Sequence, residues 1–240
     1  MATFKENVYA VCREVAEELP DWSFVSGSFK NKTLKHTNLL VPLGFAFQYG
    51  STYLQPGIFI ENKKTMKLHN KLLGFSGTTS ILRFTNLANE LKYIPEAYRI
   101  SAKIDENKAA YLKHLEDVGK PHLGKDYIDI TEAKPVLRAV LQDGIGLIER
   151  YYDLSSEENL LKGLPPEYTP RDKIIYGQYE DNAGVMLCIV RLILGDFDFV
   201  VRYHNDEIPT VRPKRMAEVD KIIAALPELK KRYEETGSVI

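Results

Sequence analysis

The chain contains only two cysteines, Cys12 and Cys188, and their separation matches no metal-binding spacing. Both lie in apolar stretches with helical periodicity, which is typical of small buried thiols in a reducing compartment. The longest apolar run, residues 185–194, is interrupted by Arg191 and is too short to cross a bilayer. The N-terminal segment is charged and lacks the apolar core of a secretory signal. We therefore expect a cytoplasmic protein without a membrane segment.

Familiar catalytic and cofactor motifs are also missing from the sequence. The five histidines do not show the spacing of a metalloprotease site. Ser76, in the stretch 74–77, lies outside the frame of a nucleophile elbow, and neither standard form of glycine-rich phosphate loop is present. We therefore expect no cofactor and no catalytic site, and keep an enzyme of unrecognised type as an alternative.

Alternating apolar residues between positions 38 and 61 predict a long β-hairpin. Large apolar side chains recur at every second position from Leu39 to Tyr49, the pattern of a strand with one buried face. Gly50-Ser51 fits a two-residue turn, which predicts that Leu43 faces Ile58. The shared apolar face predicts that Phe45 and Phe47 lie in the core under a layer of helices.

The remaining patterns divide the chain into an N-terminal part with strands and a C-terminal part with helices. Further strands are predicted at residues 21–30, with Phe24 and Phe29 on opposite faces, at 78–85 and, more weakly, at 98–104. Residues 62–77 and 120–130 are predicted to be connections. Helices are predicted at 3–19, 105–118 and through most of the chain after 130.

Together these elements predict an α+β fold, with an N-terminal antiparallel sheet of four or five strands packed by helices and a mostly helical C-terminal half. We expect a sheet region over residues 1–120 and a helical region over residues 121–240. The two regions are expected to pack together as one compact unit.

The stretch from Leu187 to His204 is compatible with two structures. Gly195-Asp196 fits either a tight β-turn or a link between two antiparallel helices, with Asp196 as the cap and Asp198 in the first turn of the second helix. We favour the helical hairpin, because the apolar run before Gly195 is long and lacks turn residues.

The same region holds the densest group of potential metal ligands, namely Asp196, Asp198, His204, Asp206 and Glu207. Carboxylates and an imidazole can hold a divalent cation, so the alternative enzyme would have its site near Asp196, Asp198 and His204. Capping explains the first two residues, and a solvated helix end explains the others. We therefore predict that no metal binds here.

Charge is unevenly distributed along the chain, although the formal net charge is only −1. Residues 1–120 hold 16 Lys and Arg against 12 Asp and Glu, residues 121–240 hold 16 against 21, and residues 149–207 hold 6 against 12. An acidic surface repels nucleic acid and favours basic partners. Glu157 and Glu158, at the start of a short capped helix, and Asp206 and Glu207, at a helix end where the dipole disfavours acids, are the candidate partner-binding residues.

Lysines in the first half of the chain keep an RNA-binding module open as a second alternative. The residues concerned are Lys30, Lys32, Lys35, Lys63, Lys64, Lys67 and Lys71, with Phe29 and Tyr53 as nearby aromatic residues. Solvated lysines that protect loops and a sheet edge explain the same pattern, and we favour that interpretation.

The order of these features resembles a known class of proteins. An N-terminal helix is followed by a W-x-F strand with a basic Phe-Lys end, a long hairpin, a capped helix in LIERYYDLSSEENLLKGLP and an LGDF helix pair. This order resembles the small α+β immunity proteins encoded beside bacterial polymorphic toxins. The resemblance implies a non-catalytic bacterial protein that binds a toxin domain and blocks its active site or substrate groove. The acidic second half would suit a basic toxin domain such as a nuclease.

Overall fold

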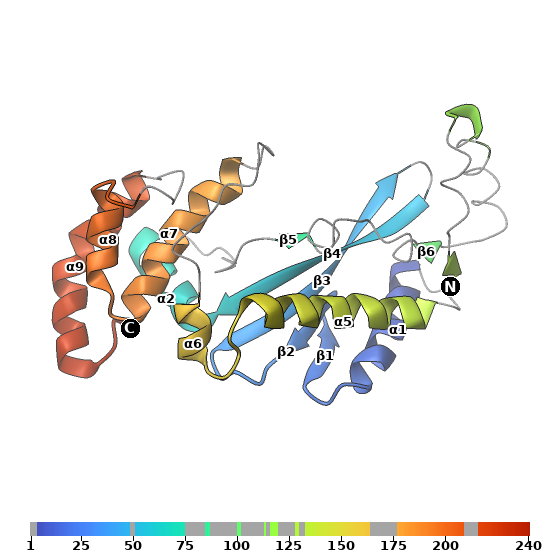
Figure 1. Cartoon of the computed structure of the whole chain (residues 1–240), viewed down its shortest axis with the longest axis horizontal. Helices are drawn as coiled ribbons and strands as arrows, with labels where there is room; N and C mark the ends of the chain where they lie inside the picture. Colours follow the sequence, from blue (N-terminus) through green and yellow to red (C-terminus); the bar gives the residue numbers. More distant parts are fainter. Residues whose placement is uncertain are drawn as a thin grey trace. The chain divides into compact units, whose positions relative to one another are not determined.

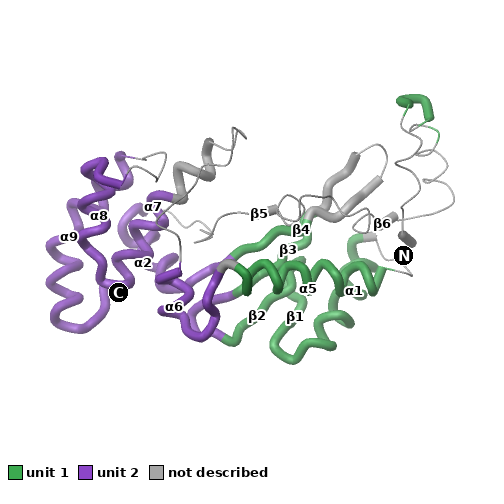
Figure 2. Tube along the Cα trace, in the orientation of Figure 1, with its two compact units in different colours: residues 1–33, 39–59, 85–150 green, residues 34–38, 60–84, 151–240 purple. Residues whose placement is uncertain are grey.

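The chain folds into two compact units, distinguished in Figure 2. The structure is a computed structural model that describes residues 4–48, 51–74, 85–86, 100–101, 113, 116–119, 128–129, 133–163, 177–208 and 216–240. Unit 1 comprises residues 1–33, 39–59 and 85–150, and unit 2 comprises residues 34–38, 60–84 and 151–240. This division differs from the expected boundary at residue 120, because residues 60–84 join the helical unit and residues 121–150 join the sheet unit.

Unit 1 is built around the sheet, whose strand order is β1-β2-β3-β4-β5 (Figure 1). The strands are β1 (Trp22–Val25), β2 (Ser28–Asn31), β3 (Thr37–Gln48), β4 (Ser51–Asn62) and β5 (Thr85–Asn86). The first two residues of β3 and the last three of β4 belong to unit 2. The pairs β1–β2, β2–β3 and β4–β5 are antiparallel, so the prediction of an N-terminal antiparallel sheet of four or five strands is confirmed.

The segment predicted as a single strand over residues 21–30 is instead a tight hairpin. Ser26 and Gly27 connect β1 to β2 with φ values of 52° and 80°, the left-handed pair that a type I′ turn requires. The turn places Phe24 opposite Phe29, and both rings are buried on one face with centroids 5.1 Å apart. The prediction was wrong because Ser-Gly is a weaker signal for this turn than Asn-Gly or Asp-Gly.

Helix α1 (Phe4–Glu17) packs against the β1–β2 hairpin. Val8, Cys12 and Val15 are fully buried on one side of the helix, as their helical spacing predicts. Tyr9 meets Phe24 edge-on, with ring centroids 5.0 Å apart. The aromatic pair fixes the helix over the strand that follows it in the chain.

The described part of β3 has the predicted one-sided burial. Leu39, Val41 and Leu43 are buried, whereas the alternate residues Leu40 and Pro42 are only half-buried. Side chains 45–48 and residues 49–50 lie outside the described part of the chain, and Ser51 is already the first residue of β4. The core positions of Phe45 and Phe47, and the facing pairs that the expected turn implies, stay predictions.

Helix α5 (Ala133–Tyr151) packs on the buried face of β3 through Gly144. A Cβ atom added to Gly144 would lie 2.5 Å from one methyl carbon of Val41 and 3.0 Å from the other. Carbon atoms that are not bonded cannot approach so closely, so only glycine lets the helix backbone lie at this distance from the strand.

Helix α2 (Lys63–Leu73) replaces the polar connection that the sequence predicts for residues 62–77. Asn62 is its N-cap, and the side-chain Oδ1 accepts the N–H groups of Lys64 at 3.0 Å and Thr65 at 3.1 Å. Its buried residues are Thr65, Leu68, His69 and Leu73. The prediction was wrong because two polar residue types, Thr and His, occupy the buried face and weaken the helical apolar pattern.

Unit 2 is otherwise formed by α6 (Glu157–Lys162), α7 (Gly177–Ile193), α8 (Phe197–His204) and α9 (Met216–Thr236). Helix α7 contacts α2, α8 and α9, and its residues 184–190 are all buried, which agrees with the buried helix predicted there. Tyr203 of α8 is fully buried against Gly184 of α7, and Phe197 meets Tyr233 of α9 with ring centroids 5.6 Å apart. The mostly helical C-terminal half of the predicted α+β fold is confirmed.

Two short strands, β6 (Ile100–Ser101) and β7 (Ile128–Asp129), form a separate parallel pair. β6 falls within the weaker strand candidate at 98–104, whereas β7 lies in a segment predicted to be a connection. Most of the strand predicted at 78–85 and of the helix predicted at 105–118 lies outside the described residues.

Candidate partner-binding residues

Glu157 lies in the first turn of α6, where its carboxylate is bound by groups of the same unit. Its Oε1 accepts the backbone N–H of His36 and, at 3.1 Å, the hydroxyl of Thr37. The side chain of Asn62 in turn donates to Thr37 Oγ1 at 2.9 Å. The fold of unit 2 thus gives Glu157 structural partners, and its role in partner binding stays a prediction.

The polar groups around Asn62 form a connected buried network. Thr37 and Asn62 are each 1% exposed and Thr65 is 0% exposed. Besides capping α2, Asn62 accepts the Thr65 hydroxyl with its backbone oxygen at 2.7 Å. The Lys63 N–H donates to the His36 carbonyl at 2.8 Å. Because buried polar groups are costly when they lack partners, this network fixes the starts of β3, α2 and α6 relative to one another.

Glu158, next to Glu157, points to solvent. Its carboxylate lies 2.5 Å from the Lys162 ammonium one helical turn away, and the two side chains are 67% and 59% exposed. The hydrogen bond from Lys162 lowers the pKa of Glu158. An exposed pair of this kind is held weakly, because water screens the charges, so Glu158 is available to a partner.

Asp206 and Glu207 close the C-terminal end of α8 in a Schellman arrangement. Asp206 has a φ of 62°, its N–H donates to the Tyr203 carbonyl at 3.3 Å, and the Glu207 N–H donates to the Arg202 carbonyl at 2.9 Å. Glycine is usual at this left-handed position, and aspartate is one of the few other residues that adopt it readily. The fold therefore gives a conformational reason for Asp206, in addition to the solvated helix end and the partner-binding role that the sequence suggests.

The side chain of Glu207 remains largely at the surface although it has two local partners. Its carboxylate lies 3.8 Å from Arg202 Nε and accepts a hydrogen bond from the Asn205 amide at 3.2 Å. Its side chain is still 52% exposed. Glu157 and Glu158 lie in the first turn of α6, whereas Asp206 and Glu207 follow the end of α8, so the two predicted pairs belong to different helix ends.

The predicted helical hairpin is confirmed, and it separates the residues of the alternative catalytic site. Asp196 is the N-cap of α8 and accepts the Phe199 N–H at 3.1 Å, whereas His204 is the last residue of that helix. An eight-residue helix is about 12 Å long, so Asp196 and His204 lie too far apart to share a metal ion. His204 Nε2 instead lies 2.9 Å from Asp220 Oδ1 of α9.

Asp196 also pairs with Arg191, a residue that the sequence shows only as an interruption of the apolar run. Its guanidinium lies 3.7 Å from Asp196 Oδ2 and 5.0 Å from the centre of the Phe199 ring. Within the described ranges, no three His, Cys, Asp or Glu side chains are grouped so that they could hold a metal ion. Asp196 at the start of α8 thus has local structural partners in the Phe199 N–H and Arg191.

The lysines proposed for RNA binding are divided between the two units. Lys30 and Lys32 belong to unit 1, and the other five belong to unit 2. Phe29 is fully buried, so its ring cannot stack on a base, and the side chain of Tyr53 lies outside those described. Lys71 lies 3.6 Å from Glu228. The aromatic part of the RNA-binding interpretation is therefore not supported by Phe29.

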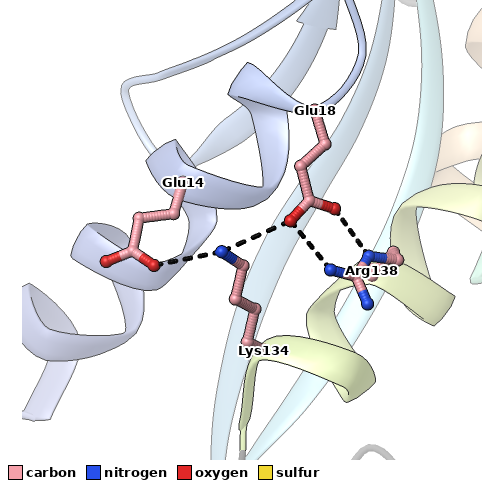
Figure 3. Close-up of polar contacts among 4 residues, drawn as sticks. All are labelled: Glu14, Glu18, Lys134 and Arg138. Atoms are coloured by element: carbon pink, nitrogen blue, oxygen red, sulfur yellow. Dashed lines mark hydrogen bonds and ion pairs between the residues drawn. The ribbon is translucent and has the colours of Figure 1, made fainter.

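A cluster of four charged residues joins α1 to α5 on the surface of unit 1 (Figure 3). Arg138 binds both carboxylate oxygens of Glu18, at 2.6 Å and 2.8 Å. Lys134 lies 3.3 Å from Glu14 and 3.3 Å from Glu18. The hydrogen bond from Arg138 is the main reason why the pKa of Glu18 falls to about 2. Each charge has a partner of opposite sign, so the cluster links α1 and the residue after it to α5 at the surface.

The two cysteines are structural. Cys12 and Cys188 are both fully buried, and burial raises the pKa of each thiol to about 12. A thiol of this kind is not a nucleophile at neutral pH, because the thiolate is the reactive form.

Comparisons with known proteins provide no relative from which a function can be transferred. No family model, curated protein or solved structure matches the sequence. Among the described helices, none is long and apolar enough to cross a membrane. Among the four candidate partner-binding residues, Glu158 and Glu207 carry exposed acidic side chains at two helix ends.

Proposed function

We propose that this chain is a cytoplasmic bacterial protein that binds a basic toxin domain and inhibits it, as immunity proteins do. The observation that carries the proposal is the charge of residues 149–207, which hold 12 acidic residues against 6 basic ones. Within this segment, Glu158 and Glu207 are more than half exposed. Their pairing with Lys162 and Arg202 is at the surface, where ion pairs contribute little to stability and exchange partners readily.

In this proposal the protein acts by covering the toxin, and it needs no catalytic group. Acidic side chains at the rim of an interface attract a basic partner and raise the association rate, while buried contacts at the centre determine how long the complex lasts. Glu158 and Glu207 have the exposure of rim residues. The order of sequence features from the N-terminal helix to the helical hairpin resembles that of immunity proteins, and this resemblance is the second support for the proposal.

The experiment that tests the proposal is protection from a neighbouring toxin. A toxin-like domain encoded immediately beside this chain would be expressed from an inducible promoter, with and without the chain. We expect growth arrest with the domain alone, recovery with the chain present, and a stable complex of the two purified proteins. Normal arrest in the presence of well-folded, abundant chain would refute the proposal.

The alternatives are tested on the same purified protein. A catalytic metal site at α8 predicts saturable thermal stabilisation by Mg²⁺, Mn²⁺, Ca²⁺ or Zn²⁺ that is lost in Asp198→Asn. An RNA-binding module predicts retention on heparin with a steep dependence on salt. For a toxin inhibitor with this charge distribution, we expect neither effect.

A further inference from the structure

We draw no further inference here: the strongest candidate, the outward face of the sheet in unit 1 where Val25 is exposed and Leu40 and Pro42 are half-buried, is an apolar surface for which nothing in the described structure shows what covers it.

Discussion

At the scale of single residues, Asn62 at the end of β4 has two structural roles that both stabilise the fold. One side chain caps α2 with its oxygen and supports Thr37, and through it Glu157, with its amide nitrogen. Loss of a helix cap typically costs about 1 kcal/mol. A buried polar group left without its partner costs about 1–3 kcal/mol more.

We therefore expect Asn62→Ala to lower the free energy of unfolding by roughly 2–4 kcal/mol, measured by urea denaturation. Asn159 is a matched control, because its amide also donates a hydrogen bond, to Ser155 Oγ at 3.0 Å, but is exposed on α6. Asn159→Ala should change the same quantity by less than about 0.5 kcal/mol. Equal effects of the two substitutions would show that the network around Asn62 is not a stabilising feature.

The ion pair between Glu18 and Arg138 predicts a specific pH dependence. The pKa of Glu18 is lowered from 4.5 to about 2 in the folded protein, so its stabilising contribution is fully present above pH 4.5. That contribution is lost as the pH falls through about 2, where the folded carboxylate takes up its proton. Solvent and salt screen this exposed pair, so the effect is expected to shrink at high ionic strength.

Carbon-detected NMR titration of the Glu18 carboxyl group measures this directly. We expect a midpoint near pH 2 in the parent protein, and a midpoint shifted upward toward the ordinary glutamate value in Arg138→Gln. The same substitution at Arg202, which pairs with Glu207 in the other unit, should leave the Glu18 titration unchanged. A Glu18 midpoint that does not respond to Arg138→Gln would show that the bidentate contact is absent in solution.

At the scale of elements, two glycines in α5 have opposite expected effects although they lie two residues apart. Helix propensity alone predicts that Gly→Ala at either position stabilises the helix by up to about 1 kcal/mol. The structure predicts this only for Gly146, around which an added Cβ would meet no atom within 4 Å. At Gly144 the added Cβ would collide with Val41.

Gly144→Ala should therefore lower the free energy of unfolding by about 1–3 kcal/mol, the range of overpacked cores, whereas Gly146→Ala should leave it unchanged or raise it. Thermal unfolding of the two variants gives the comparison. Combining Gly144→Ala with Val41→Ala should restore part of the loss caused by the first substitution, because the colliding methyl groups are removed. Stabilisation by Gly144→Ala would contradict the close packing of α5 on β3.

The sequence predicts those elements whose signals lie within a few neighbouring residues. Asp196, as cap, and Asp198, in the first turn, are visible beside Gly195, so the α7–α8 hairpin is predicted correctly. The turn at Ser26-Gly27 and the α2 helix are missed, because Ser-Gly is a weak type I′ signal and His69 lies on a buried face where an apolar residue is expected.

For the candidate site, too, the sequence cannot predict contacts between residues that lie far apart in the chain. Glu157 accepts hydrogen bonds from His36 and Thr37, which precede it by 121 and 120 positions in the chain. No local pattern predicts a contact between residues so far apart, so the sequence alone cannot distinguish the roles of Glu157 and Glu158. Only the folded chain separates a structural carboxylate from its exposed neighbour.

At the scale of the whole molecule, the contrast between a basic first half and an acidic second half does not follow the division into units. Residues 60–84, which include Lys63, Lys64, Lys67 and Lys71, belong to the same unit as the acidic segment after Tyr151. Helix α2 contacts α7 and α9, and Lys71 pairs with Glu228. The charge that a partner would meet is therefore set by local surfaces within unit 2 and not by the total for half the chain.

A charge reversal at two exposed acidic residues of unit 2 therefore tests the partner more directly than the net charge of half the chain does. Glu158→Lys combined with Glu207→Lys should leave the fold intact, because both carboxylates are exposed and make only surface contacts. Association with a basic toxin domain should slow by about tenfold at low salt and depend less on ionic strength, since rim charges act mainly on the association rate. Stopped-flow mixing over a series of salt concentrations measures both quantities.

The control for this reversal is Glu234→Lys combined with Glu235→Lys on α9. Glu235 also forms an exposed pair with a lysine one turn away, Lys231 at 4.0 Å, so the control makes the same change in net charge and disrupts the same type of contact. If both double variants slow association equally, the partner responds to net charge alone, and Glu158 and Glu207 do not lie at its interface. If neither variant alters the rate at low salt, electrostatic attraction to the acidic helices plays no part in binding, and the partner is not a basic domain.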